Sequence, residues 1–282
     1  MPQLTGKTVL VTGSTSGIGL AACMELAKRG ADLVMVARDR AKGEACAAAV
    51  ERSAGARRPS LMLCDFASRK SIGELAGELR RSRSRLDILV NNAGSVSARR
   101  EVTEDGIERT FAVNHLGYFL LTNLLIDLLE KGAPARVVNV ASIAHITGTM
   151  DFDDLGFEKG FSTRKAYNRS KLANVLFTRE LARRLQGRGI TVNCLHPGAV
   201  STNIWSHAAW WTQPFLAVAR LFMVSPRKGG DAIVFLATSP EVEGKSGGYY
   251  ENSRLVLPSR LARDDALAAK LWDVSATMVK LA

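Results

Sequence analysis

Short apolar runs alternate with longer stretches of helical spacing along the whole chain. Most of the short runs are continuously apolar, which is expected of strands that are buried on both faces. Strands alternating with helices predict a parallel sheet that is covered by helices on both sides. The longest helical stretches are expected at 104–130, with a break near Asn114, and at 165–186. The predicted strands are 8–11, 32–36, 61–64, 88–91, 136–140, 191–195 and 248–251.

The composition is typical of one domain. The chain has 282 residues, of which 46% are hydrophobic, and this suffices for a large core. Since no repeat, low-complexity tract or linker divides the sequence, we expect a single α/β domain over 1–282. In such sheets ligands bind beyond the carboxyl ends of the strands. Gly13, Asp65, Asn92 and Ser142 all fall at or just after strand ends, so one crevice should collect them.

A glycine-rich turn follows the first predicted strand and opens a helix. It reads Thr12-Gly-Ser-Thr-Ser-Gly-Ile-Gly19. Glycines allow a tight turn that approaches a pyrophosphate closely, and the N–H groups at the start of a helix attract its charge. The strand, turn and helix together therefore predict a dinucleotide site. The expected contacts are Gly13, Ser14, Thr15, Ser16, Gly17, Ile18 and Gly19.

Tyr167 and Lys171 are separated by about one helical turn, so both side chains should project from one face of a helix. A phenol titrates near pH ~10, and a neighbouring ammonium favours the phenolate and lowers its pKa. Such a pair can donate or accept a proton during carbonyl reduction or alcohol oxidation. The plainer alternative is a surface tyrosine and a solvated lysine on an amphipathic helix.

Four motifs occur here in one order: the Thr12–Gly19 turn, Asn91-Asn-Ala-Gly94, Ser142, and Tyr167-x3-Lys171. In this the chain resembles the short-chain dehydrogenase/reductase family from about Thr5 to about Thr202. The stretches 113–122, 170–181 and 192–198 resemble its retinol dehydrogenase-like branch. The resemblance implies a single Rossmann-type domain with about seven parallel strands and helices on both faces. It also implies an oxidoreductase that interconverts an alcohol and a carbonyl by hydride transfer.

The resemblance also implies a role for each matching residue. Tyr167 would act as acid and base, and Ser142 would hydrogen-bond the substrate oxygen, so both would bind substrate. Lys171 would favour the phenolate and bind the nicotinamide ribose, and Asn114 would hold a water of a proton relay. On the cofactor, Asp65 would contact the adenine and Thr202 the carboxamide, while the turn formed by Asn92, Ala93 and Gly94 would pack on the adenine-side ribose.

The chain departs from most of the family in the long gap between Ser142 and Tyr167. The extra segment at 148–164 contains Asp151, Asp153 and Asp154. These carboxylates lack the rest of a Ca²⁺-loop pattern, so we expect loop and capping residues and no metal site.

The residues after the second strand bear on the choice of cofactor. Enzymes that prefer NAD usually place a carboxylate there for the ribose 2′-hydroxyl. This chain has Ala37 and then Arg38, whose guanidinium suits a 2′-phosphate. Asp39 competes with this interpretation, but we take it as the N-cap of the next helix. NADP(H) is therefore favoured over NAD(H), with Tyr167 and Lys171 also on the cofactor list.

The segment 200–225 is expected to form a substrate lid. Its part 204–224 is apolar and carries three tryptophans, which suits a hydrophobic pocket. A core helix and an interfacial membrane element are alternatives, whereas Pro214 and Arg220 oppose a transmembrane helix. We expect a lipophilic substrate, such as a retinoid-like, steroid-like or long-chain aldehyde or ketone. His115, His145 and His196 are expected to be structural.

Charge and cysteine usage exclude some classes of function. The net charge is +11, but the basic residues are dispersed and not interleaved with aromatic residues, so nucleic acid is not an expected partner. Part of the charge suits an anionic cofactor. Four scattered cysteines without metal-ligand spacing suggest buried thiols and a cytoplasmic protein. Peripheral membrane contact is an open alternative. The apolar helix faces at 118–121 and 175–177 suit either a homo-oligomer or burial against the sheet.

Two other functions compete with the NADP(H)-dependent enzyme. One is an NAD(H)-dependent dehydrogenase of a steroid-like alcohol, and the other is a non-catalytic, cofactor-sensing protein. The intact set of Asn114, Ser142, Tyr167 and Lys171 favours an enzyme, because a protein without activity has no physical need to keep all four. The natural substrate, the direction of the reaction and the oligomeric state do not follow from the sequence.

Overall fold

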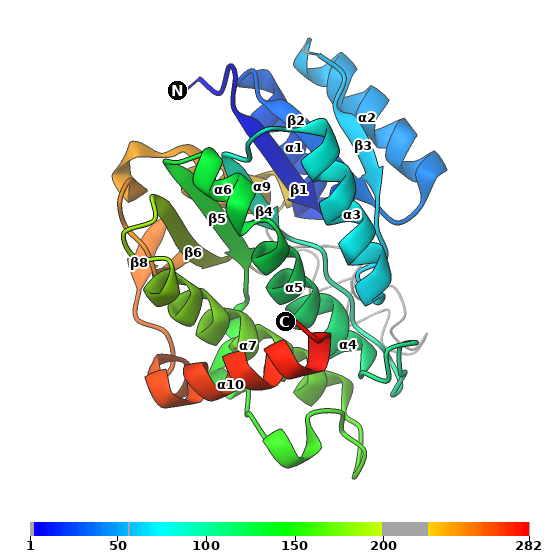
Figure 1. The fold of residues 1–282 in the computed structure, drawn as a ribbon, viewed down its shortest axis with the longest axis vertical. Helices are drawn as coiled ribbons and strands as arrows, with labels where there is room; N and C mark the ends of the chain where they lie inside the picture. Colours follow the sequence, from blue (N-terminus) through cyan, green and yellow to red (C-terminus); the bar gives the residue numbers. More distant parts are fainter. Residues whose placement is uncertain (1–2, 56, 199–224, 282) are drawn as a thin grey trace.

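The computed structural model describes residues 3–55, 57–198 and 225–281. Its centre is one sheet in the order β3-β2-β1-β4-β5-β6-β7-β8 (Figure 1). The first seven strands are parallel, and β8 pairs antiparallel with β7. The α/β prediction and all seven predicted strands are confirmed. The strands are β1 Thr8–Thr12, β2 Asp32–Ala37, β3 Ser60–Leu63, β4 Ile88–Asn91, β5 Ala135–Val140, β6 Ile190–His196, β7 Tyr249–Glu251 and β8 Arg254–Val256.

The eighth strand was not predicted because it is short and exposed. Asn252 and Ser253 join it to β7 with positive φ angles of 49° and 61°. Positive φ at both central residues is the geometry of a two-residue hairpin turn. The more common Asn-Gly or Asp-Gly signal is missing here, so the sequence pattern does not predict the hairpin.

Helices cover both faces of the sheet, as predicted. One core contains residues of α1, α2 and α9, and the other contains residues of α3, α5, α7 and α10. The predicted helix at 165–186 agrees with α7 within two residues. The helices are α1 Gly17–Lys28, α2 Arg40–Ala54, α3 Arg69–Ser82, α4 Arg109–Phe111, α5 Gly117–Leu124, α6 Ile126–Lys131, α7 Thr163–Arg184, α9 Pro226–Thr238 and α10 Asp265–Val279.

The helix predicted at 104–130 begins later and is broken twice. It starts with α4, continues through a π-helical turn at Ala112–Leu116 into α5, and bends at Leu125 before α6. The π turn confirms the break expected near Asn114. Such turns often lie at functional sites, because they release backbone groups from the regular hydrogen-bond ladder.

A buried polar chain ties helix α7 to the middle of the sheet. The Asn91 side chain in β4 donates to the Asn139 side chain in β5 at 2.8 Å, and Asn139 donates to Thr178 in α7 at 2.9 Å. Buried amides must find such partners or lose free energy. The chain of bonds therefore fixes the position of α7 against the carboxyl ends of β4 and β5.

Helix α10 lies across α7 and contacts α5 (Figure 1). The Trp272 ring stacks on Phe177 at 6.0 Å and meets Phe119 edge-on at 4.8 Å. Phe119 and Phe177 are buried. The segments 118–121 and 175–177 are therefore buried within the chain and partly covered by α10, whereas the alternatives were a partner subunit or burial against the sheet; the homo-oligomer stays a prediction. No helix in the described ranges combines the length and apolar character that crossing a membrane needs.

Replacing Trp272 with alanine should lower the free energy of unfolding by about 2–3 kcal/mol, because the ring is only partly buried and its removal uncovers two phenylalanines. Urea unfolding would measure this change. Asp273→Ala, on the exposed side of the same helix, is the control and should change stability by less than ~0.5 kcal/mol. Equal effects of the two substitutions would contradict the packing role of Trp272.

Candidate active site

A cleft runs along the carboxyl ends of the strands, with a volume of about 1210 Å³. The order of the strands reverses between β1 and β4, and sheets of this kind bind ligands at that point. Most of the predicted site residues line the cleft. They are Gly13, Thr15, Ser16, Gly17, Ile18, Arg38, Asp65, Asn92, Ala93, Gly94, Ser142, Tyr167 and Lys171.

Three of the predicted residues that the structure describes do not line it. Ser14 is fully buried and donates its hydroxyl to the Val36 carbonyl at 2.9 Å, so its side chain joins the glycine turn to β2. Gly19 and Asn114 lie behind the cleft wall. Thr202 falls outside the described residues, as does the predicted lid at 200–225 apart from Ser225.

The glycine turn is built against the turn that follows β4. Gly13 has a φ of 63°, and a Cβ at this position would lie 2.7 Å from the Ala93 Cα. A Cβ at Gly19 would lie 2.4 Å from the Asn92 side-chain nitrogen. Only glycine fits either place. The Thr12 hydroxyl accepts the Asn92 and Ala93 N–H groups at 2.8 and 2.9 Å.

Helix α1 begins at the floor of the cleft with free backbone donors. Its N-cap, Ser16, makes no side-chain capping bond, and the first turn carries no acidic residue. N–H groups at the start of a helix without a capping side chain form a site for an anion. The residues present therefore fit the pyrophosphate of a dinucleotide.

Two cations lie beyond the end of β2. Arg38 is exposed and lines the cleft, and so does Lys42. Asp39 accepts the Lys42 N–H at 2.7 Å and caps α2, so the prediction for Asp39 is confirmed. Sequence reasoning missed Lys42. The sequence does show a basic residue soon after Arg38. It lies in the first turn of the helix that Asp39 caps.

Ser142, Tyr167 and Lys171 meet at the end of β5. Ser142 and Tyr167 both line the cleft there, and hydrogen bonding by the Ser142 side chain acts to lower the pKa of Tyr167. The Lys171 ammonium donates to the Val140 carbonyl at 3.0 Å and lies 5.6 Å from the centre of the Tyr167 ring. Helix α7 thus brings a phenol and an ammonium to the cleft wall beside a hydroxyl from the sheet.

Burial has the largest effect on the pKa values of Tyr167 and Lys171. It raises the pKa of Tyr167, while the hydrogen bond with Ser142 works in the opposite direction. It also lowers the pKa of Lys171 to about 8. We expected Lys171 to lower the pKa of Tyr167, and the direction in the folded protein is the opposite. The reason is that the cost of an ionised phenol away from water exceeds the opposing effect of the hydrogen bond with Ser142.

Asn114 lies fully buried in the π turn behind the site. Its side-chain oxygen accepts the Ser95 N–H at 2.7 Å. Its side-chain nitrogen donates to the Ser95 carbonyl at 3.0 Å and to the Ser170 hydroxyl at 3.1 Å. Asn114 therefore joins the loop after β4 to the helix that carries Tyr167 and Lys171.

The extra segment at 148–164 is a capped loop. Asp151 accepts the Asp153 N–H at 3.1 Å, and Asp154 accepts the Glu158 N–H at 2.6 Å. The expectation of capping carboxylates is confirmed at Asp151 and Asp154. Within the described parts of the chain, no group of three or more His, Cys, Asp or Glu side chains is arranged to hold a metal ion. All four cysteines are free thiols.

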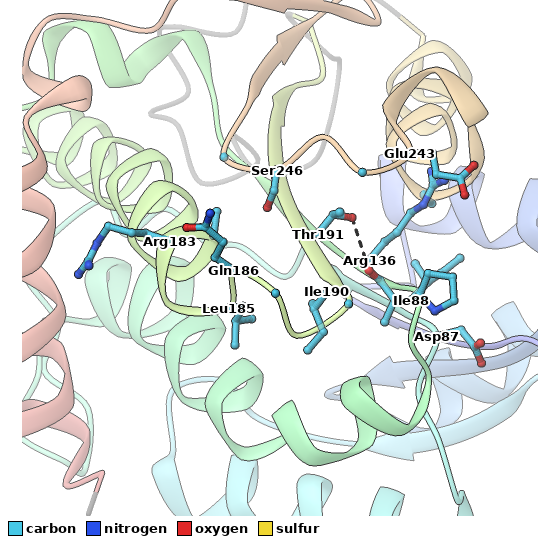
Figure 2. A pocket seen from close by; sticks show the side chains of 18 of the residues that line it. Asp87, Ile88, Arg136, Arg183, Leu185, Gln186, Ile190, Thr191, Glu243 and Ser246 are labelled. Atoms are coloured by element: carbon cyan, nitrogen blue, oxygen red, sulfur yellow. Dashed lines mark hydrogen bonds between the residues drawn. The ribbon is translucent and has the colours of Figure 1, made fainter.

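A second cavity of about 950 Å³ lies at the opposite, amino-terminal ends of β4, β5 and β6 (Figure 2). Most of its charged groups are in ion pairs: Lys7 pairs with Asp87 at 2.9 Å, and Arg183 pairs with Glu180 at 2.7 Å. The Arg136 guanidinium donates to two backbone carbonyls at the end of α9. Since these groups already have partners, the strand-end cleft is the better candidate for chemistry.

Lys171→Met should stabilise the cofactor-free protein at pH 7. The pKa of Lys171 is about 8 in the folded protein and ordinarily 10.5, so the unfolded chain binds more protons between these limits. Stability from this group therefore rises with pH across that window. The gain from the substitution should be at most about 3 kcal/mol at pH 7 and shrink towards pH 10.5. Urea unfolding at several pH values measures it, and a gain independent of pH would contradict this origin.

Comparison with known proteins agrees with this geometry. The model of the short chain dehydrogenase family matches residues 7–212. Human retinol dehydrogenase 13 is 42% identical over 99% of this chain and 86% of its own length, and human retinol dehydrogenase 14 is 44% identical over 98% and 87%. An uncharacterized protein from Mycobacterium paratuberculosis has a similar structure, with a TM-score of 0.81 and 32% identity over 99% of this chain and 96% of its own. The NADP complex of Pseudomonas aeruginosa RhlG has a TM-score of 0.70 and 27% identity over 94% and 98%.

Since the family model covers most of the chain and the retinol dehydrogenases align over nearly all of it, the protein belongs to the short-chain dehydrogenase family, in its retinol dehydrogenase-like branch.

Proposed function

We propose that the protein is an NADP(H)-dependent oxidoreductase that interconverts a lipophilic alcohol and its aldehyde or ketone. The observation that carries this proposal is the convergence of Ser142, Tyr167 and Lys171 in one wall of a cleft that also holds Arg38. The relatives named as retinol dehydrogenases support a retinoid-like substrate.

When bound, the nicotinamide cofactor supplies the hydride in reduction and accepts it in oxidation. Tyr167 donates the proton to the carbonyl oxygen in reduction. Burial raises the pKa of Tyr167, so the phenol is protonated before the reaction, and the hydrogen bond with Ser142 and the Lys171 ammonium would favour the phenolate that forms when the proton leaves. The Ser142 hydroxyl hydrogen-bonds the same substrate oxygen and stabilises its developing negative charge.

Lys171 sets the charge of the site. Its ammonium is buried, with its pKa lowered by burial, so a nearby anion or polar ligand would favour the charged form. We assign it contact with the cofactor ribose and electrostatic stabilisation of the Tyr167 phenolate once the proton has left. Asn114 holds the π turn against α7. We assign to this turn the water of the proton relay that would lie behind Lys171.

The cofactor would lie along the strand ends. We assign Thr15, Ser16, Gly17 and Ile18 to the pyrophosphate, together with Gly13, which shapes the turn. Asp65 is assigned to the adenine, and Asn92, Ala93 and Gly94 to the adenine-side ribose. Thr202 is assigned to the carboxamide, and the segment 200–225 to a lid within a single domain spanning 1–282.

Arg38 and Lys42 support NADP(H) over NAD(H). Both line the adenine end of the cleft, where the 2′-phosphate would lie, and the carboxylate of Asp39 is already engaged in capping α2. Two cations near one phosphate favour it by charge and by hydrogen bonding. An NAD(H)-dependent dehydrogenase of a steroid-like alcohol and a non-catalytic, cofactor-sensing protein are the competing functions.

Tyr167→Phe should reduce turnover by roughly 10²–10⁴-fold while NADPH still binds, because the substitution removes only the proton donor. NADPH oxidation with retinal and with a long-chain aldehyde measures turnover, and quenching of tryptophan fluorescence measures binding. A variant that keeps wild-type turnover would contradict the acid–base assignment. A wild-type protein that binds NADPH but reduces no aldehyde or ketone would favour the sensing protein.

Arg38→Asp should weaken NADPH binding by about 10- to 100-fold and leave NADH binding nearly unchanged, because it replaces a partner of the 2′-phosphate with a like charge. Arg40→Asp changes the same charge two residues away, where the side chain does not line the cleft, and should weaken both cofactors little. Equal losses for NADPH and NADH in Arg38→Asp would refute the 2′-phosphate role.

A further inference from the structure

His145 uses both nitrogens of its ring. It lies in the 3-10 turn Ile143–Thr147 directly after Ser142 and is 1% exposed. Its Nδ1 lies 2.8 Å from the Ser142 carbonyl oxygen, and its Nε2 lies 3.1 Å from the Ser259 backbone nitrogen. A carbonyl only accepts and a backbone N–H only donates, so the ring must be neutral with its proton on Nδ1.

The surroundings keep the ring neutral. It packs on the Tyr249 ring of β7 at 4.7 Å. Burial lowers the pKa of His145, while the Ser142 carbonyl and the Glu251 carboxylate act in the opposite direction. His196 at the end of β6 also interacts with it electrostatically. An imidazolium would lose the bond from Ser259, since Nε2 could no longer accept it.

Ser142 needs such support because it lies beyond the sheet. Strand β5 ends at Val140, and the last ladder bond at this edge runs from the Ala141 N–H to the Leu195 carbonyl. The Ser142 carbonyl is held instead by the N–H and the ring of His145, at 3.1 and 2.8 Å. Fixing this peptide fixes the direction in which the Ser142 hydroxyl enters the cleft.

The other end of the bridge comes from the C-terminal part of the chain. Ser259 lies between Leu257, which is 72% exposed, and Leu261, which is 37% exposed. Its own hydroxyl caps the next turn by accepting the Ala262 N–H at 3.3 Å. The bond from the Ser259 N–H to His145 therefore anchors an otherwise exposed segment to the edge of the active site.

We propose that His145 is a positioning residue: its neutral ring bridges Ser259 to the Ser142 peptide and so aims the Ser142 hydroxyl at the substrate oxygen. The inference rests on the proposed role of Ser142. It extends the active site to a segment more than a hundred residues away in sequence, which lines no part of the cleft. Because the bridge ends at the Ser142 peptide, it should affect chemistry and leave cofactor binding unchanged.

A matched pair of variants tests the bridge. His145→Asn keeps an N–H that can donate to the Ser142 carbonyl, whereas His145→Leu has similar size and no donor. His145→Leu should lower kcat for NADPH-dependent reduction of retinal by about 10- to 100-fold, since small misplacements of a catalytic group cost that much. His145→Asn should recover only part of the loss, because its amide can still donate to the Ser142 carbonyl but cannot accept the Ser259 N–H. Both variants should bind NADPH as the wild type does.

A second pair tests the other end of the bridge. Ser259→Pro removes the backbone N–H, and Ser259→Ala keeps it while removing the capping hydroxyl. The proline variant should lose kcat to about the level of His145→Asn, which breaks the same bond, with the alanine variant close to wild type. This pair also decides the matter if a His145 variant fails to fold.

The outcomes separate the inference from the proposed function. An active wild type with equal kcat in His145→Asn and His145→Leu, or in Ser259→Pro and Ser259→Ala, overturns the bridge alone. Losses of NADPH affinity that match the losses of kcat also overturn it, because they indicate general structural damage. A wild type that reduces no carbonyl compound with NADPH or NADH overturns both the bridge and the proposed function.

Discussion

The buried ammonium of Lys171 is the constraint around which the site is arranged. The residue is 3% exposed, and its Nζ donates to the Val140 carbonyl. Among the described residues, no carboxylate pairs with it. A charge held away from water without a counter-ion is unfavourable. Keeping this cation in the cleft wall therefore lowers the stability of the folded protein. In the proposed function, an anionic cofactor and a phenolate formed during reaction are the partners that would relieve this cost.

The rest of the fold holds that cation beside a phenol and a hydroxyl. The polar chain through Asn91 and Asn139 fixes α7 on the sheet, and the π turn of Asn114 joins α7 to the loop after β4. On the other side of the cleft, the close approach of Gly13 to Ala93 shapes the cofactor end. Both ends of the site are therefore held rigidly. The contacts that hold them are made by the backbone and by buried side chains more than by surface residues.

Much of this arrangement could be predicted from sequence. Apolar runs located seven parallel strands, and the glycine turn and the Tyr167–Lys171 spacing located the two ends of the cleft. The features that the sequence did not predict depend on contacts between distant segments. The side-chain direction of Ser14, the π turn's bonds to Ser95 and the bridge from His145 to Ser259 need the folded geometry. The raised pKa of Tyr167 was missed because spacing along a helix reveals a neighbour but not the extent of burial.

The central claim is hydride transfer in this cleft to a lipophilic carbonyl compound. The most direct measurement is isotope transfer from NADPH deuterated at C4 of the nicotinamide, prepared with the label on either face, to retinal or a long-chain aldehyde. The account predicts that the alcohol carries the deuterium at its carbinol carbon with one of the two labelled cofactors. Alcohol without deuterium from both cofactors, or no alcohol at all, would contradict it.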